Sequence, residues 1–563
     1  MKKMKRLLAV LMTLAMVLGM AIMTFTGISA APIRASAAPS ARKSAGNKPQ
    51  PSDTALGAVT NVATGAIVRA YRIIEPMYSA NGFTGYRAAA GTGIANPLEP
   101  TSSEVTSIAA NKALLDRLEE VTLLESGPVG ADGLSTYSGW LGAGYWLVLV
   151  TPLTGSGTKI YNPMLIGVYY SVEGTGSSAT LVSGGAVNAN SRWSLNSEPV
   201  FAKSAQPQII KRIVGSSGKD VSDGNENGND VAVGDTVSFQ IEAQIPAYSK
   251  AYQNVKVDIT DQTGGGLIID LAAGISVNAG SGPAITAKPG IDYTLTAEDR
   301  GFRISFTSEY ALAHSGETMY VNYVGLMKEN AGYNFDANEN TAILEYTSDP
   351  RDINRTKVTE DRTYTYTFGI DSSLNGASAA PWNKVTQELI KTGEAGTVSG
   401  SAVTAGALSG AVFTLTGAEG QKRAYTATSD ALGYLSFTGL DAGMYYLQET
   451  AAPEGYSLND AVIPVEIRAD YNEDGTLRSY TVTVDGKAVS TYTAAYQIND
   501  TTKKPEITNI LCADATYEIR NTRLGGLPST GGIGTTIFTV VGCAIMVLAA
   551  ALFFSNRRKT AKK

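Results

Sequence analysis

The sequence has little cysteine, little histidine and no excess of positive charge. It contains two cysteines and one histidine, His314, in 563 residues. With so little histidine we expect neither a histidine-dependent catalytic triad nor a multi-histidine metal site. We also expect no bound metal and no other cofactor.

Acidic side chains outnumber basic ones in the central part of the chain. Of the 45 lysines and arginines, ten lie in residues 1–37 and 531–563, which contain no acidic residue. The remaining 35 basic and 51 acidic groups give the central part a net charge of −16. Nucleic acids and anionic membranes require a basic face, so we expect no nucleic-acid partner.

Residues 1–37 are typical of a secretory signal peptide. Four basic residues within the first six precede an apolar run at 7–25 and a stretch of small residues. Cleavage after Ala30 and cleavage after Ala37 both fit. Residues 38–53 are rich in Ala, Pro, Ser and Lys, which predicts a flexible leader. Outside the cell, Cys512 has no partner for an intramolecular disulfide because Cys543 lies in the trimmed tail.

The C-terminal segment, residues 527–563, combines a short motif, an apolar stretch and a basic tail. The motif is Leu527-Pro528-Ser529-Thr530-Gly531, and the apolar stretch at 533–554 is long enough to cross a bilayer of about 30 Å. This order resembles the sortase cell-wall sorting signal of Gram-positive surface proteins. The resemblance implies cleavage after Thr530 and transfer of its carbonyl to an amine. The membrane span is then transient, and the mature protein is secreted and anchored to peptidoglycan in the cell wall.

The central part is predicted to be mainly β, with tandem Ig-like β-sandwich domains behind a mixed α+β N-terminal domain. We expect domains at 54–203, 204–375 and 384–525, with a linker at 372–383. The first contains a helix that begins with a capping box from Thr101 to Glu104 and carries apolar residues along one face as far as Leu118. The other two show alternating apolar and polar residues and frequent turns, including Asp485-Gly486.

Two segments of the third domain resemble motifs of sortase-assembled pilins. Residues 445–456 read YYLQETAAPEGY, which matches the E-box pattern YxLxETxAPxGY, and residues 408–415 read LSGAVFTL, which resembles the LxGAxFxL strand. The resemblance implies a CnaB-type Ig-like domain with an autocatalytic isopeptide bond between Lys391 and Asn521. Glu449 is then the catalytic acid that polarises the Asn521 carbonyl, and Lys384 is a weaker alternative nucleophile.

The middle domain resembles the CnaA-type domain of the same pilins. The segments that carry the resemblance are VGDTV at 233–237, ITD at 259–261 and NTAILEY at 340–346. It implies a second bond, from Lys211 to Asn340, with Asp261 as the acid. Asp258 stays open as an alternative acid and Asn354 as an alternative acceptor.

A lysine at the junction of the first two domains is the candidate for linkage between subunits. Backbone pilins carry a motif ending in YPKN at this point, and its lysine accepts the threonine of the next subunit. Here residues 201–204 read FAKS, so only the aromatic residue and Lys203 are retained. The resemblance implies a bond from Thr530 to Lys203.

An Asx-rich segment matches the start of a calcium loop. Asp223, Asn225, Asn227 and Gly228 fit D-x-N-x-N-G, but Gly234 stands where a bidentate glutamate is required. We therefore interpret the segment as an Asx-rich hairpin loop.

Together these features predict a structural protein, the major subunit of a covalently polymerised pilus that supports adhesion. The implied partners are a class C pilus sortase, a housekeeping sortase, further copies of the chain, minor pilins, and host or bacterial surface ligands. The alternative is a monomeric wall-anchored adhesin or a minor pilin that is not polymerised through Lys203. A secreted hydrolase has no supporting motif.

Overall fold

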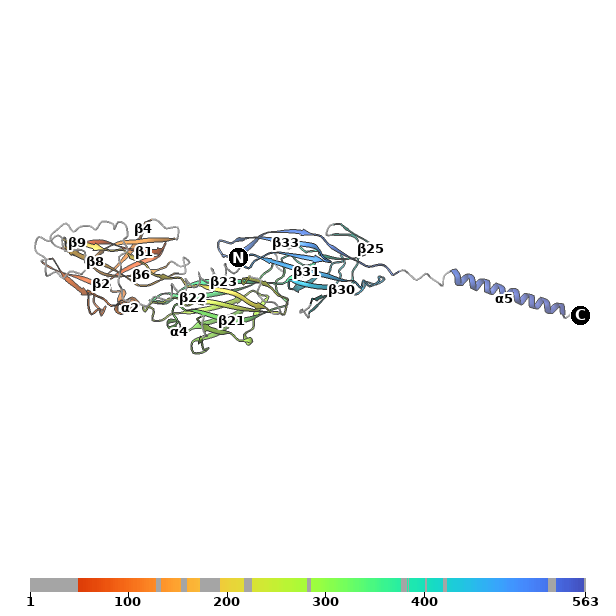
Figure 1. The fold of residues 1–563 in the computed structure, drawn as a ribbon, viewed down its shortest axis with the longest axis horizontal. Helices are drawn as coiled ribbons and strands as arrows, with labels where there is room; N and C mark the ends of the chain where they lie inside the picture. The colour runs from red at the N-terminus through yellow and green to blue at the C-terminus, as the bar shows by residue number, and fades with distance from the viewer. Residues whose placement is uncertain are drawn as a thin grey trace, which may run out of the picture.

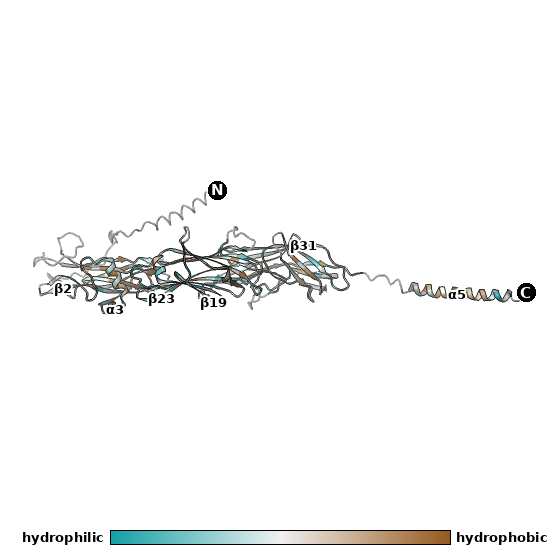
Figure 2. Cartoon of the chain, turned by 90° about the horizontal axis from the view of Figure 1, so that it is seen from below, coloured by the Kyte–Doolittle hydropathy of each residue, from teal (hydrophilic) through white to brown (hydrophobic). Residues whose placement is uncertain are grey.

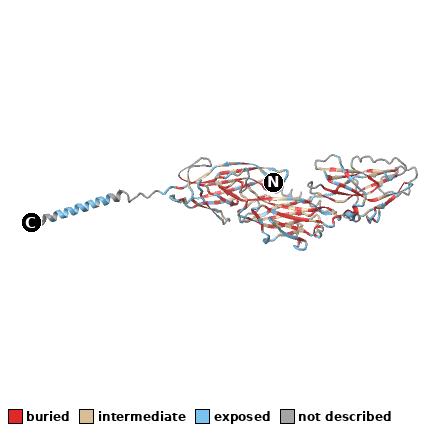
Figure 3. Ribbon diagram, turned by 180° about the vertical axis from the view of Figure 1, so that it is seen from behind, coloured by how far each residue is buried: buried red, intermediate tan, exposed pale blue. Residues whose placement is uncertain are grey.

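Three β domains follow one another along an elongated molecule, and a long helix projects from the far end (Figure 1). The computed structural model describes residues 49–80, 82–127, 133–152, 159–172, 193–216, 225–280, 285–375, 382, 384–399, 402–418, 423–524 and 533–560. The predicted signal peptide, most of the leader and the Leu527–Gly531 motif lie outside these residues. Buried residues form a separate core in each domain (Figure 3).

The N-terminal domain is built on a nine-stranded sheet with the order β10-β1-β5-β4-β2-β6-β8-β9, and β3 pairs with β2. Trp146 and Tyr170 are among its largest fully buried side chains. Tyr170 donates to the carbonyl of Gln50 and to Asp53, so the end of the predicted leader is packed on this domain. The strands are β1 (Thr54–Ala63), β2 (Ile67–Ser79), β3 (Gly82–Ala88), β4 (Glu120–Ser126), β5 (Leu134–Gly142), β6 (Gly144–Thr151), β7 (Ile160–Tyr161), β8 (Met164–Val172), β9 (Trp193–Ser197) and β10 (Val200–Phe201).

The predicted helix is present, but it is shorter than its apolar pattern. Helix α2 (Ser102–Ala110) begins with the expected capping box between Thr101 and Glu104. The helix stops at Asn111, whose backbone is not helical and whose side chain caps the separate helix α3 (Lys112–Leu115). An asparagine side chain competes for backbone hydrogen bonds in this way, so the single helix predicted as far as Leu118 was wrong.

The middle domain is a sandwich of two six-stranded sheets. The first sheet has the order β12-β14-β21-β17-β18 with β16 paired to β21, and the second has the order β13-β23-β22-β15-β20-β19. Alternating residues of β14 are buried, as their sequence pattern predicted. The elements are β11 (Ser204–Ala205), β12 (Ile209–Ser216), β13 (Gly228–Asp230), β14 (Thr236–Gln244), β15 (Val257–Thr263), β16 (Leu267–Ile269), η2 (Leu271–Ala273), β17 (Ser276–Ala279), β18 (Ile285–Thr286), β19 (Tyr293–Glu298), β20 (Gly301–Phe306), α4 (Ser308–Ala313), β21 (Thr318–Met327), β22 (Asn338–Asp349) and β23 (Asp352–Tyr366).

The third domain packs a three-stranded sheet, β26-β25-β35, against a seven-stranded sheet, β28-β27-β30-β31-β32-β33-β34. Strand β24 pairs with β29, so the chain has entered this domain by Phe368. At the β32–β33 turn, Asp485 and Gly486 both have positive φ, as the predicted hairpin requires. The strands are β24 (Phe368–Ile370), β25 (Leu389–Ser399), β26 (Ala402–Ala407), β27 (Val412–Gly417), β28 (Ala424–Thr428), β29 (Phe437–Leu440), β30 (Gly443–Ala451), β31 (Val462–Tyr471), β32 (Leu477–Val484), β33 (Lys487–Ile498), β34 (Pro505–Asp514) and β35 (Tyr517–Arg520).

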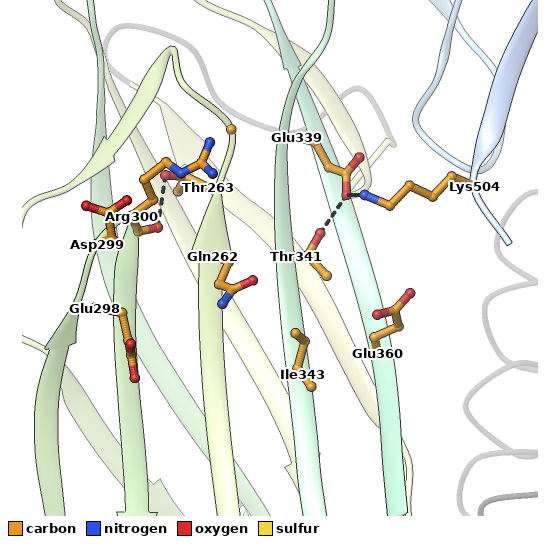
Figure 4. Close-up of a pocket in the computed structure, with 11 residues that line it drawn as sticks. Gln262, Thr263, Glu298, Asp299, Arg300, Glu339, Thr341, Ile343, Glu360 and Lys504 are labelled. Atoms are coloured by element: carbon orange, nitrogen blue, oxygen red, sulfur yellow. Dashed lines mark hydrogen bonds and ion pairs between the residues drawn. The ribbon is translucent and has the colours of Figure 1, made fainter. Parts of the chain in front are cut away.

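Polar contacts fix the middle domain against the third domain. Asp230 accepts hydrogen bonds from the Ala442 backbone and the Tyr471 hydroxyl, both at 2.7 Å. Lys504 reaches across to Glu339 at 2.7 Å, over a cleft of about 450 Å³ (Figure 4). At the other junction, the Arg351 guanidinium donates to side chains of the N-terminal domain. Contacts at both junctions favour a stiff rod.

Helix α5 (Ile533–Thr560) lies beyond the third domain and packs on none of the three cores (Figure 1). Its segment 537–555 is long and apolar enough to cross a membrane. Most of the helix is coloured as hydrophobic in Figure 2. This placement fits the transient span that the sequence predicts.

Candidate cross-linking sites

Lys391, Glu449 and Asn521 meet in the core of the third domain. Strand β25 pairs in parallel with β35, so that Lys391 lies opposite Ile519. Asn521 follows two residues later on the same face, and its backbone N–H donates to the Thr392 carbonyl at 2.9 Å. The Lys391 Nζ is 2.5 Å from Asn521 Oδ1. Parallel pairing of β25 with the domain's last strand, β35, therefore brings the amine to the amide.

Glu449 reaches the pair from β30 in the opposite sheet. Its Oε1 accepts a hydrogen bond from Asn521 Nδ2 at 2.9 Å and lies 3.7 Å from Lys391 Nζ. Its Oε2 accepts from the Asn459 backbone at 2.8 Å. The carboxyl thus contacts the amide nitrogen, whereas the sequence interpretation had it polarise the carbonyl. This position suits transfer of a proton to the departing nitrogen.

The environment of this cluster favours a neutral amine. Lys391 is fully buried, and its Nζ lies 5.7 Å from the centre of the Phe413 ring. Burial lowers the pKa of Lys391 to about 8, although the nearby Glu449 opposes the shift. Burial penalises the charged form of an amine, and only the uncharged form is a nucleophile.

Lys211, Asp261 and Asn340 form a second buried cluster, between the two sheets of the middle domain, in which the lysine and the asparagine come from opposite sheets. Lys211 is on β12 in the first sheet, while Asp261 and Asn340 are on the neighbouring strands β15 and β22 in the second. All three are buried, and Lys211 Nζ donates to Asp261 Oδ2. Tyr323 on β21 stands among them, and its hydroxyl donates to Asp261 Oδ2 at 2.6 Å.

Burial dominates the electrostatics of this second cluster. Burial lowers the pKa of Lys211 and raises that of Asp261, although their mutual attraction opposes both shifts. Both directions favour an uncharged amine and a protonated carboxyl. Among the residues described, Asp261 Oδ1 and Asn340 Oδ1 have no hydrogen-bond partner. A buried, unsatisfied oxygen calls for an explanation, and a role in chemistry is one that fits this cluster.

The alternative residues lie outside both clusters. Asp258 pairs with Lys256 and Arg303, away from Lys211. Asn354 is exposed on β23, where its backbone N–H binds Asp352. In the third domain, Lys384 pairs with Asp514 at the surface. None of the three contacts a residue of the cluster to which it was assigned.

Lys203 is exposed between two short strands at the first domain junction. On one side Phe201 pairs with Thr60 of β1, and on the other Ser204 pairs with Tyr161 of β7. The Lys203 carbonyl accepts a hydrogen bond from the Asn162 backbone at 3.0 Å. The backbone is therefore fixed on both sides while the side chain reaches solvent.

The Asx-rich segment forms a contact between domains in its described part. The side-chain amides of Asn225 and Asn227 donate to the carbonyls of Asn472 and Glu473 in the third domain. Asp223 lies outside the described residues. Within the described ranges there is no group of three or more histidine, cysteine or acidic side chains that could hold a metal ion.

Tyr323 is the site residue that sequence reasoning missed. It lies in a strand of alternating apolar and polar residues, and the chain contains 28 tyrosines. A tyrosine at such a position is expected to be a core residue. No pattern along the sequence distinguishes it. Only the folded sheets show that its hydroxyl reaches Lys211 within its own sheet and both Asp261 and Asn340 in the opposite sheet.

Three family profiles match separate parts of the chain. They describe a T6 antigen Ig-like domain at residues 52–204, a prealbumin-like fold domain (SpaA) at 383–484 and an LPXTG cell wall anchor motif at 521–562. The trypsin-resistant surface T6 protein of Streptococcus pyogenes serotype M6 is 26% identical over 551 residues. That alignment covers 90% of this chain and 95% of the relative.

The fold also matches a solved structure. The T6 backbone pilin of serotype M6 S. pyogenes, described as a modular three-domain structure, aligns with a TM-score of 0.58 and 20% identity. The alignment covers 85% of this chain and all of that one. The cell-wall anchor motif, the homology to the T6 protein and the three β domains in a row make this chain similar to the LPxTG-anchored backbone pilins of Gram-positive surface pili.

Proposed function

We propose that the chain is a backbone pilin polymerised covalently and stabilised by two internal Lys–Asn isopeptide bonds. The observation that carries the proposal is the pair of buried clusters, each of which holds a lysine amine beside an asparagine amide and a carboxyl group. A buried lysine with no structural or chemical use is costly to the fold. A buried lysine of this kind occurs in two domains, which supports the same cross-linking role in both.

The third-domain cluster can complete the reaction with its own groups. The neutral Lys391 amine attacks Cγ of Asn521 and forms the new N–C bond. One proton of the amine passes through the Glu449 carboxyl to Asn521 Nδ2, the Cγ–Nδ2 bond breaks, and ammonia leaves. Glu449 ends in its starting state, so the step needs no cofactor. Proximity within the folded core supplies much of the acceleration.

Polymerisation is proposed through Lys203 and Thr530. Sortase cleaves after Thr530 and holds its carbonyl as a thioester, which the Lys203 amine of the next subunit attacks. Exposure of Lys203 and the fixed backbone around it support this role. A pilus sortase then extends the fibre, a housekeeping sortase attaches it to peptidoglycan, and minor pilins or surface ligands bind to the finished pilus.

Two measurements test the proposal. The intact mass of residues 38–524 should fall short of the sequence mass by two ammonia molecules, and a full mass would contradict both bonds. Cell-wall extracts boiled in SDS should give a ladder of high-mass species. A single band would instead favour a monomeric adhesin, the alternative that the altered FAKS segment at 201–204 keeps open.

A further inference from the structure

The Tyr323 hydroxyl contacts a reacting group of both proposed partners in the middle domain. It accepts a hydrogen bond from Lys211 Nζ and another from Asn340 Nδ2 at 3.2 Å, and it donates to Asp261 Oδ2 at 2.6 Å. Phe239 stacks on its ring at 5.4 Å between centroids, and Phe302 packs edge-on at 5.0 Å. The hydroxyl is therefore held in one place between the amine and the amide.

The two clusters differ at this point. In the third domain, the Glu449 carboxyl binds Asn521 Nδ2 directly. In the middle domain, Asn340 Nδ2 donates to the Tyr323 hydroxyl, and the Asp261 carboxyl also interacts with the Asn340 side chain. The middle domain therefore has a hydroxyl beside its carboxyl, whereas the third domain uses the carboxyl alone.

Amide exchange requires that the amine lose a proton and that the departing nitrogen gain one. A tyrosine hydroxyl can accept one proton and donate another at the same oxygen. Burial raises the pKa of Tyr323 well above its ordinary value, so the hydroxyl keeps its proton at neutral pH. It can then donate at the moment when the amine attacks.

We propose that the Tyr323 hydroxyl relays the proton in formation of the Lys211–Asn340 bond, an inference that rests on the cross-link proposed above. Lys211 Nζ attacks Cγ of Asn340 and gives one proton to the Tyr323 oxygen. The Tyr323 O–H turns from Asp261 Oδ2 and gives its own proton to Nδ2, the Cγ–Nδ2 bond breaks, and ammonia leaves. The proton taken from the amine regenerates the hydroxyl, which returns to its 2.6 Å hydrogen bond with Asp261.

The test is Tyr323→Phe in the full chain, which removes the hydroxyl and keeps the ring. Samples from a time course of cell-free synthesis are digested, and the two cross-linked peptides are quantified by mass spectrometry. The Lys211–Asn340 bond should form about a hundredfold more slowly or not at all, the range expected on loss of a general acid–base group. The Lys391–Asn521 bond should form at the wild-type rate.

The matched control is Tyr252→Phe. Tyr252 is also buried in the middle domain, and its hydroxyl donates to the Ser348 carbonyl, not to the cluster. This variant should form both bonds normally. If the wild type forms the Lys211–Asn340 bond and Tyr323→Phe forms it equally fast, the relay is overturned while the cross-link stands. If the wild type lacks the bond, the proposed cross-link itself fails.

A second measurement separates proton transfer from packing. Tyr323→Phe is combined with Asn340→Ala, which prevents the bond in every sample, and thermal unfolding of the middle domain is followed. We expect the unfolding temperature to fall only slightly below that of Asn340→Ala alone, because the hydrogen bonds of the hydroxyl to Lys211 and Asp261 are lost. Two differences in unfolding temperature are compared: the double variant against Asn340→Ala, and Asn340→Ala against the wild type. If the first difference is as large as the second, Tyr323 has a packing role and the relay is overturned.

Discussion

Lys391 Nζ and Asn521 Oδ1, separated by 130 residues along the chain, lie 2.5 Å apart in the third domain. They join β25 to the domain's last strand, β35, because these two strands pair in parallel. A bond at this point would carry tension from one strand to the other without loading the sheet between them. A bond between Lys211 and Asn340 would likewise carry tension past most of the middle domain.

Between the two proposed bonds, residues 341–390 alone would carry the load. Within this stretch, Asp371 and Glu388 exchange two hydrogen bonds: Asp371 N–H donates to Glu388 Oε2 at 2.8 Å, and Glu388 N–H donates to Asp371 Oδ1 at 2.6 Å. These contacts connect the two sides of the connecting segment 372–387. Hydrogen bonds at the entry to the third domain therefore complement the covalent bonds.

Replacement of Glu449 by alanine should prevent the third-domain bond and leave the domain folded. The intact mass should rise by one ammonia relative to the wild type, after allowance for the substitution. In the chain-entropy model a cross-link that closes a loop of about 100 residues is worth about 4.7 kcal/mol, so thermal unfolding should occur at a clearly lower temperature. Glu454→Ala, an exposed glutamate in the following turn, is the control. A bond that still forms without Glu449 would give the acid role to another group.

A variant that cannot form this bond should become more stable as the pH rises. In Asn521→Ala, Lys391 stays buried, and burial lowers its pKa to about 8 from an ordinary value of 10.5. Between these values the unfolded chain binds a proton that the folded chain does not, so the free energy of unfolding increases with pH. Calorimetry from pH 7 to pH 10 measures the slope. Lys391→Met in the same background should remove it, and an unchanged slope would show that other groups cause it.

The Asp371–Glu388 pair should give the third domain the opposite pH dependence at lower pH. Burial raises the pKa of both carboxyls, because no cation faces either of them among their described partners. The folded state then binds protons that the unfolded state has lost, so stability should fall as the pH rises from 5 to 7. Each group can contribute up to about 1.4 kcal/mol per pH unit. Glu388→Gln should reduce the dependence of the unfolding temperature on pH. If this dependence is the same in the variant and the wild type, the pair does not hold a proton in the folded state.

The sequence predicted the fold class well, because the alternating strands and the capped helix depend on local patterns. Local patterns also led to error where one residue changes the backbone: Asn111 ends α2 early, and Gly410, with φ of 86°, keeps 408–411 out of β27. The cluster residues came from motif resemblance, and the structure brings them together. Tyr323 could not be found in this way, because its role depends on contacts within its own sheet and with the opposite sheet.

Lys203→Arg should abolish polymerisation without disturbing the fold. The Lys203 side chain is exposed, and arginine keeps both the charge and most of the aliphatic stem. A guanidinium stays protonated at physiological pH, so it cannot attack the Thr530 thioester. Cell-wall extracts of the mutant should contain monomers, attached through the intact Leu527–Gly531 motif, and no ladder.

Neighbouring lysines should not replace Lys203. Lys211 is fully buried in the middle-domain cluster, where a sortase-bound thioester cannot reach it. Lys384→Arg is the matched control, because Lys384 is also partly exposed but belongs to the third domain. Its extracts should show the wild-type ladder. If the ladder is undiminished in Lys203→Arg, the acceptor is a different lysine, and the FAKS segment at 201–204 only connects the first two domains.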